Sequence, residues 1–150
     1  MPLQKGRGVW EQEEGTRFIR VDLDVFSRRR LTALATAFGD RVFLLHEERH
    51  GSRYILRCEA RGWNLTIDQE IRVLIALIKK LPRHLRRIWN DAQSRQFNVG
   101  IQAGLQPRYR EFKLLPRTIA LVAEVRATIV ITVYAPEVPS PRLKPRKRPR

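Results

Sequence analysis

The chain has 150 residues, 43% of them hydrophobic, and its 30 basic residues against 15 acidic ones give a net charge of +15. This length and composition predict one globular domain whose core needs no disulfide or metal ion, and they exclude a wholly disordered chain. No apolar run reaches the ~18 residues that span a bilayer, and the single Cys58 excludes both an internal disulfide and a cysteine-based zinc site.

The N-terminal segment, residues 1–15, is polar and contains an acidic patch, which predicts a flexible arm. It lacks the apolar stretch of a secretory signal, so we expect a cytoplasmic protein without membrane contact. Residues 17–25 then alternate strictly between apolar and polar side chains, as in a half-buried strand. Ser27 is the expected N-cap of a helix over residues 28–38, because apolar side chains recur there at helical spacing.

The middle of the chain predicts a β-hairpin followed by two helices. Residues 41–47 and 53–60 read as its strands, joined by a connection longer than the tightest hairpin types. Thr66 is the expected cap of a strongly amphipathic helix that ends or kinks at Pro82. Residues 83–92 predict the second helix, with its apolar side chains directed inward.

The last third of the predicted domain contains a strand over 96–103, a helix beginning near Pro116 and a final strand over 128–134. Residues 27–45 and 115–133 match at an offset of 88, which reflects either a duplicated domain or two β-α-β units that arose independently. The predicted fold class is therefore α/β (α+β), a single mixed sheet with helices packed on it.

A change of composition marks the end of the predicted domain, which we place at residues 16–135. Five prolines lie between residues 136 and 149 and exclude a helix or a central strand there. Six basic residues and no acidic ones occupy residues 142–150. This composition predicts a disordered, extended basic tail.

A search for catalytic groups yields only weak candidates. Asp22 and Asp24 share a strand face with Arg20, which favours a solvated, charge-balanced surface. His46 and His50 lie at a strand end and a turn, without a third metal ligand nearby. Cys58 alternates with apolar neighbours, as a buried small side chain does. No nucleotide-binding loop or nucleophile motif is present, so we expect a binding protein that is not an enzyme and needs no cofactor or metal.

The positive charge predicts polyanionic partners, and it gathers in four places. Arg28, Arg29 and Arg30 open the first predicted helix, either as a solvated helix start or as contacts for an anion. The other three groups are the candidate nucleic-acid contacts: the helix junction Lys79, Lys80, Arg83, Arg86 and Arg87; the loop Arg108, Tyr109 and Arg110; and the tail residues Arg142, Lys144, Arg146, Lys147, Arg148 and Arg150.

The run from the long helix through Phe97-Asn98-Val99-Gly100-Ile101 to the closing strand that ends in Tyr134 resembles small uncharacterised bacterial α/β domains. Some of those domains are associated with polymorphic-toxin immunity proteins. The resemblance covers residues 69–135 and implies a protein that works by binding another protein. The high positive charge departs from what an inhibitor of nucleases requires, because nuclease active sites are themselves basic.

Two functions follow from these patterns. The first is association with the phosphate backbone of nucleic acid through the tail and the helix junction, without sequence readout, because no helix-turn-helix or RNA-recognition motif is present. The alternative is a protein-interaction module that uses a sheet edge or the face bearing Arg20, Asp22 and Asp24. Only six of the 30 basic residues are lysines, and such an arginine bias also arises from GC-rich coding without any selected partner.

Overall fold

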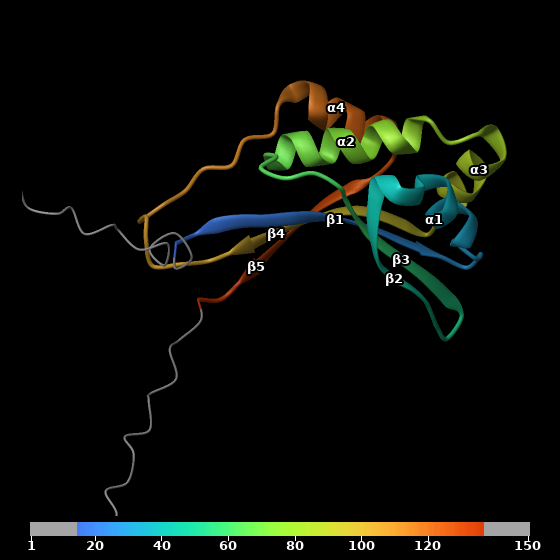
Figure 1. Cartoon of the computed structure of the whole chain (residues 1–150), viewed down its shortest axis with the longest axis horizontal. Coiled ribbons are helices and arrows are strands. Elements are labelled where there is room, and N and C mark those ends of the chain that lie inside the picture. Colours follow the sequence, from blue (N-terminus) through green and yellow to red (C-terminus); the bar gives the residue numbers. More distant parts are fainter. Residues whose placement is uncertain (1–14, 137–150) are drawn as a thin grey trace, which may run out of the picture.

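The computed structural model describes residues 15–136, which form a five-stranded mixed sheet with four helices packed on one of its faces (Figure 1). This architecture confirms the predicted fold class. A short 3-10 helix, η2 (Gly39–Arg41), follows the first helix. The elements are, in chain order, β1 (Arg17–Ser27), α1 (Thr32–Phe38), β2 (Val42–His50), β3 (Arg53–Ala60), α2 (Ile67–Lys79), α3 (Arg83–Asp91), β4 (Ser94–Gln102), α4 (Pro116–Glu124) and β5 (Thr128–Tyr134).

The strand order is β2-β3-β1-β4-β5, and every neighbouring pair is antiparallel except β4 and β5. The first four strands have the split β-α-β arrangement found in ferredoxin-like domains, because β3 inserts between β1 and β2. The second β-α-β unit closes differently, since β5 lies directly beside β4. Both predicted β-α-β units are therefore present. The strands of the first unit, β1 and β2, are separated by β3, whereas those of the second, β4 and β5, are adjacent.

The alternation along β1 separates two environments. Val21, Leu23 and Val25 are buried beneath the helices, while Asp22 lies on the face that no helix covers. The predicted cap of α2 is confirmed: the Thr66 hydroxyl accepts from the Gln69 N–H at 3.2 Å, and the Gln69 side chain accepts from the Thr66 N–H at 2.9 Å. This capping box fixes where α2 begins over the sheet.

Two local predictions were wrong, for reasons of short-range geometry. Ser27 does not cap a helix, because it is the buried last residue of β1, and its hydroxyl accepts from the Arg29 N–H at 3.0 Å. Residues 28–30 therefore turn outside the helix, and α1 begins only at Thr32. The hairpin turn is tight, with β2 ending at His50, β3 beginning at Arg53, and Gly51 taking a positive φ of 58°.

Trp89 connects α3 to the far side of the helical layer. Its side chain is 1% exposed, and its indole N–H donates to the Val125 carbonyl at 3.0 Å, just after α4. This bond holds the short helix α3 at the end of α4, and α3 also packs against α1.

Three further predictions concern membrane-spanning helices and the two ends of the chain. No helix in the described part of the chain is long and apolar enough to cross a membrane. Most of the predicted N-terminal arm, residues 1–14, lies outside the described residues. The same holds for residues 137–150, which contain the predicted basic tail.

Candidate functional site

The sheet register brings several basic segments to one end of the molecule. The end of β1 pairs with the start of β4, Phe26 with Ser94, and the start of β4 pairs with the start of β5, Gln96 with Thr128. The carboxyl ends of α2 and α4 and the whole of α3 lie at this end as well (Figure 1). We call it the basic end; its cations are Arg28, Arg29, Arg30, Lys79, Lys80, Arg83, Arg86, Arg87, Arg95 and Arg126.

Two carboxylates pair with cations of the basic end. Asp91 pairs with Arg29 at 3.2 Å, which ties α3 to the segment after β1. Glu124 pairs with Lys79 at 2.8 Å, which ties the end of α4 to the end of α2. These acids therefore neutralise only two of the ten cations.

Two further arginines serve the protein's own backbone. The Arg95 guanidinium donates to the carbonyls of Trp89 and Ala92, both at 2.9 Å, where α3 ends. Burial, and then the nearby charge of Arg126, lower the pKa of Arg95 from its usual value. Arg86 donates to the Lys79 carbonyl at the end of α2. The smaller part of this lowering of the pKa of Arg95 comes from the like charge of Arg126.

Six cations remain without a hydrogen bond or ion pair to any other residue between 15 and 136, and all six are exposed. They come from the segment after β1, the α2–α3 junction and the turn after α4. Such side chains are free to contact a partner without first breaking an internal interaction. They are Arg28, Arg30, Lys80, Arg83, Arg87 and Arg126.

The structure divides the predicted nucleic-acid contacts between two ends of the sheet. The junction residues 79–87 lie at the basic end, whereas the loop Arg108-Tyr109-Arg110 lies at the other end, where Arg110 donates to the Thr16 carbonyl at 3.3 Å. The two ends are separated by the length of β1, about 30 Å. The described chain also ends beside this loop, because the Ala103 N–H donates to the Tyr134 carbonyl at 2.9 Å. The predicted tail contacts lie outside the described residues.

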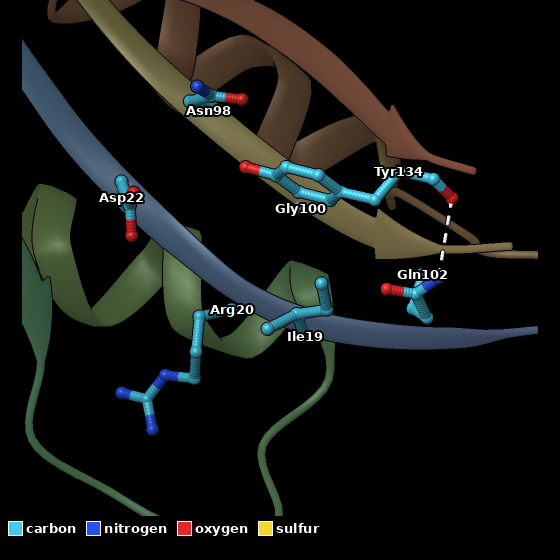
Figure 2. A pocket seen from close by; sticks show the side chains of 7 residues that line it. All are labelled: Ile19, Arg20, Asp22, Asn98, Gly100, Gln102 and Tyr134. Atoms are coloured by element: carbon cyan, nitrogen blue, oxygen red, sulfur yellow. Dashed lines mark hydrogen bonds between the residues drawn. The ribbon is translucent and has the colours of Figure 1, made fainter. Parts of the chain in front are cut away.

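The uncovered face of the sheet contains a hollow of about 320 Å³ (Figure 2). Tyr134 and Gly100 both line it, and Gly100 contributes no side chain (Figure 2). The Asn98 side-chain oxygen accepts from the Thr132 hydroxyl at 2.7 Å, and the Gln102 side-chain amide donates to the Ala135 carbonyl at 2.9 Å. The hollow is therefore polar and formed mainly by β1, β4 and β5; its lining residues are Ile19, Arg20, Asp22, Asn98, Gly100, Gln102 and Tyr134.

Carboxylates outnumber cations beside this hollow. Arg57 donates to both oxygens of the buried Asp24, at 2.6 and 3.0 Å. Arg20 contacts Glu70 at 3.2 Å and Glu59 at 3.5 Å.

Asp22 adds a further acidic group to this face. Burial, and then the negative charges of Asp24 and Glu59, raise the pKa of Asp22 above its usual value. This face carries local negative charge and does not suit phosphate, unlike the basic end.

The weak catalytic candidates remain weak in three dimensions. Burial raises the pKa of the Cys58 thiol to about 12, with smaller contributions from Asp24, Asp22 and Glu59, so the nucleophilic thiolate is scarce at neutral pH. His50 contacts Glu48 at 2.8 Å on the exposed hairpin. Within residues 15–136, no group of three or more His, Cys, Asp or Glu side chains is arranged to hold a metal ion.

Sequence reasoning missed the assembly of the basic end. Arg28–Arg30, the α2–α3 junction, Arg95 and Arg126 lie far apart in the chain and meet only through the strand order and the antiparallel pairing of β1 with β4. No protein-family model, curated protein or solved structure matches this chain. The proposal below therefore rests on the geometry and the charge of the described residues.

Proposed function

We propose that the protein binds nucleic acid, and that its basic end contacts the phosphate backbone. The observation that carries this proposal is the gathering of ten cations from separate segments at one end, of which only two are paired with an acidic side chain. A nucleic-acid duplex presents one negative charge about every 1.7 Å of its axis, so such a surface attracts it strongly. An arginine excess caused by coding bias alone gives no reason for this concentration.

The residue types at the basic end support backbone contact over base recognition. Its free groups are guanidinium and ammonium ions, which suit phosphate oxygens. The largest aromatic side chain at this end, Trp89, is buried and already donates to a carbonyl. The exposed Tyr109, which would suit base stacking, lies at the other end of the sheet. Phosphate contacts position a protein on nucleic acid without reading its sequence.

The basic residues of the predicted tail supply a second contribution. Residues 142–150 contain six cations and no acid, and they follow the described chain by only a few residues. A tethered basic segment binds a polyanion at a high effective concentration once the folded part is bound. We expect the basic end to define the site and the tail to increase its affinity.

Fluorescence anisotropy of labelled single- and double-stranded nucleic acid, measured at several salt concentrations, tests this proposal. If each of the six free cations contacts one phosphate, the slope of log affinity against log salt has a magnitude of about 5 for a duplex. The tail cations add to this value in the full chain, so deletion of residues 142–150 is expected to lower the slope toward about 5 and to leave binding measurable at low salt. Salt-independent affinity, absence of binding at low salt, or complete loss of binding with the tail would contradict the proposal.

A further inference from the structure

A second surface, at the opposite end from the basic end, is a cleft of about 800 Å³. It lies between the start of β1, the start of α2 and residues 110–115, which precede α4. Its lining combines five apolar residues, Phe18, Leu65, Ile67, Phe112 and Leu115, with four basic residues, Arg17, Arg72, Arg110 and Lys113, and two acidic ones, Asp68 and Glu111. An occupant of this cleft therefore needs both an apolar part and negative charge.

The polar groups at the floor of the cleft already have partners. Asp68 is 5% exposed; it accepts from the Leu115 N–H at 2.8 Å and contacts the Arg72 guanidinium at 3.0 Å. The Thr66 and Gln69 side chains cap the start of α2. The start of α2 is therefore not an open anion site. The basic side chains at the outer rim of the cleft are chiefly Arg110 and Lys113, which are both exposed.

The N-terminal segment enters the described structure at the edge of this cleft. The Thr16 N–H donates to the Gln106 carbonyl at 2.9 Å, and the Thr16 carbonyl accepts from Arg110, a cleft residue. The next residue, Arg17, itself lines the cleft. The chain that precedes Gly15 therefore begins within one or two residues of the cleft.

The sequence of that preceding segment complements the cleft. Residues 9–14 are Val-Trp-Glu-Gln-Glu-Glu, with two apolar side chains followed by three acids. These are the two kinds of group that the cleft requires. Six extended residues span at most about 20 Å, which allows the segment to follow the cleft from its edge.

We propose that residues 9–14 dock in this cleft of their own chain, with Trp10 on the apolar floor and the acids Glu11, Glu13 and Glu14 against the basic rim. A tryptophan buries up to about 250 Å², and a short tether gives an effective concentration in the millimolar range. Docking places three carboxylates beside Arg110 and Lys113. The segment thereby neutralises the end of the molecule opposite the basic end and disfavours polyanion binding there.

A nitroxide at position 12 of the full chain, introduced as Gln12→Cys, tests this contact without nucleic acid. Cys58 is buried and its thiol has a pKa raised to about 12, so the label reacts at the new cysteine. We expect paramagnetic broadening of amide signals around Leu65, Arg72 and Lys113, measured against the reduced nitroxide. The hairpin tip at Gly51 serves as the distant reference.

Because the tether alone brings the label near the cleft, the decisive comparison is with variants that remove the proposed contacts. We expect Trp10→Ala to lower the ratio of docked to undocked segment by roughly tenfold or more, because the apolar burial is lost. Replacement of Glu11, Glu13 and Glu14 by glutamine weakens docking in a salt-dependent way. Val9→Ala, which removes only two methyl groups, is the milder matched control.

Three results would overturn the inference. The first is equal broadening in the parent protein and in Trp10→Ala. The second is broadening that does not favour the cleft over other amides near Thr16. The third is broadening of an isotope-labelled chain by a separate nitroxide-labelled chain, which would show docking between molecules. None of these results depends on nucleic-acid binding, so failure here and failure of the proposed function are distinguishable.

Discussion

Replacement of Arg28, Arg30, Arg83 and Arg87 by glutamine is expected to lower the affinity for duplex nucleic acid by roughly 10³-fold at 0.1 M salt. The same change is expected to reduce the magnitude of the salt slope by about 3 to 4, because each lost phosphate contact removes about 0.9 from it. These four arginines are exposed and have no side-chain partner among the described residues. The fold should therefore survive their replacement, which a thermal unfolding curve verifies.

A variant with the same change of net charge provides the control. Arg61, Arg108, Arg110 and Arg117 are four exposed arginines away from the basic end, and two of them belong to the loop that the sequence nominated. Their replacement by glutamine is expected to change the salt slope by less than about 1. Equal losses in the two variants would show that net charge, rather than the arrangement of the basic end, governs binding.

The largest effect on stability is expected at the ion pair beneath the uncovered sheet face. Asp24 is 2% exposed, and Arg57 donates to both of its oxygens. Removing the guanidinium in Arg57→Ala leaves a buried carboxylate without its counter-ion. The free energy of unfolding should fall by about 3 kcal/mol, at the lower end for buried pairs because Arg57 is partly in solvent.

Urea unfolding of two companion variants separates this loss from other consequences of the substitution. Arg53→Ala, on the same strand but exposed, should change the free energy of unfolding by less than about 0.5 kcal/mol. In Arg57→Ala, adding Asp24→Asn should restore part of the loss, because the neutral amide no longer requires a counter-ion. A loss below about 1 kcal/mol in Arg57→Ala would show that water takes over the role of the guanidinium.

The elements were largely predictable because their patterns are local. The period of two in residues 17–25 identified β1, and the Thr66 cap with the Pro82 stop delimited α2. Ser27 misled because a hydroxyl that accepts from the N–H two residues ahead forms a turn as readily as a helix cap. The connection of the β-hairpin was predicted too long, because β2 continues to His50 through charged, exposed residues whose composition does not indicate a strand.

The candidate site was predictable only in part. The cluster of basic residues at 79–87 was visible in the sequence. Its proximity to Arg28–Arg30 was not, because it depends on β1 ending beside the start of β4. The same strand order separates the loop at Arg108 from the junction by the length of the sheet. Pairings between distant strands follow from tertiary packing, which periodicity in one sequence does not encode.

The uncovered sheet face and the basic end differ in charge. The carboxylates of Asp22, Asp24 and Glu59 lie on the uncovered sheet face, whereas five exposed arginines without a side-chain partner among the described residues lie at the basic end. Split β-α-β domains that bind RNA do so on the open sheet with exposed aromatic side chains. In this protein that surface presents carboxylates on its central strand, so we expect nucleic acid to avoid it.

The most direct test is to map the contact surface by NMR on the ¹⁵N-labelled full chain, titrated with a short duplex at low salt. The account predicts that amide shifts concentrate in residues 28–31, 79–87 and 126–127, while Asp22 and Asn98 on the uncovered sheet face stay unchanged. Shifts centred on the hollow beside Tyr134, or confined to residues 142–150, would contradict it and would leave the ten cations of the basic end without the role assigned to them here.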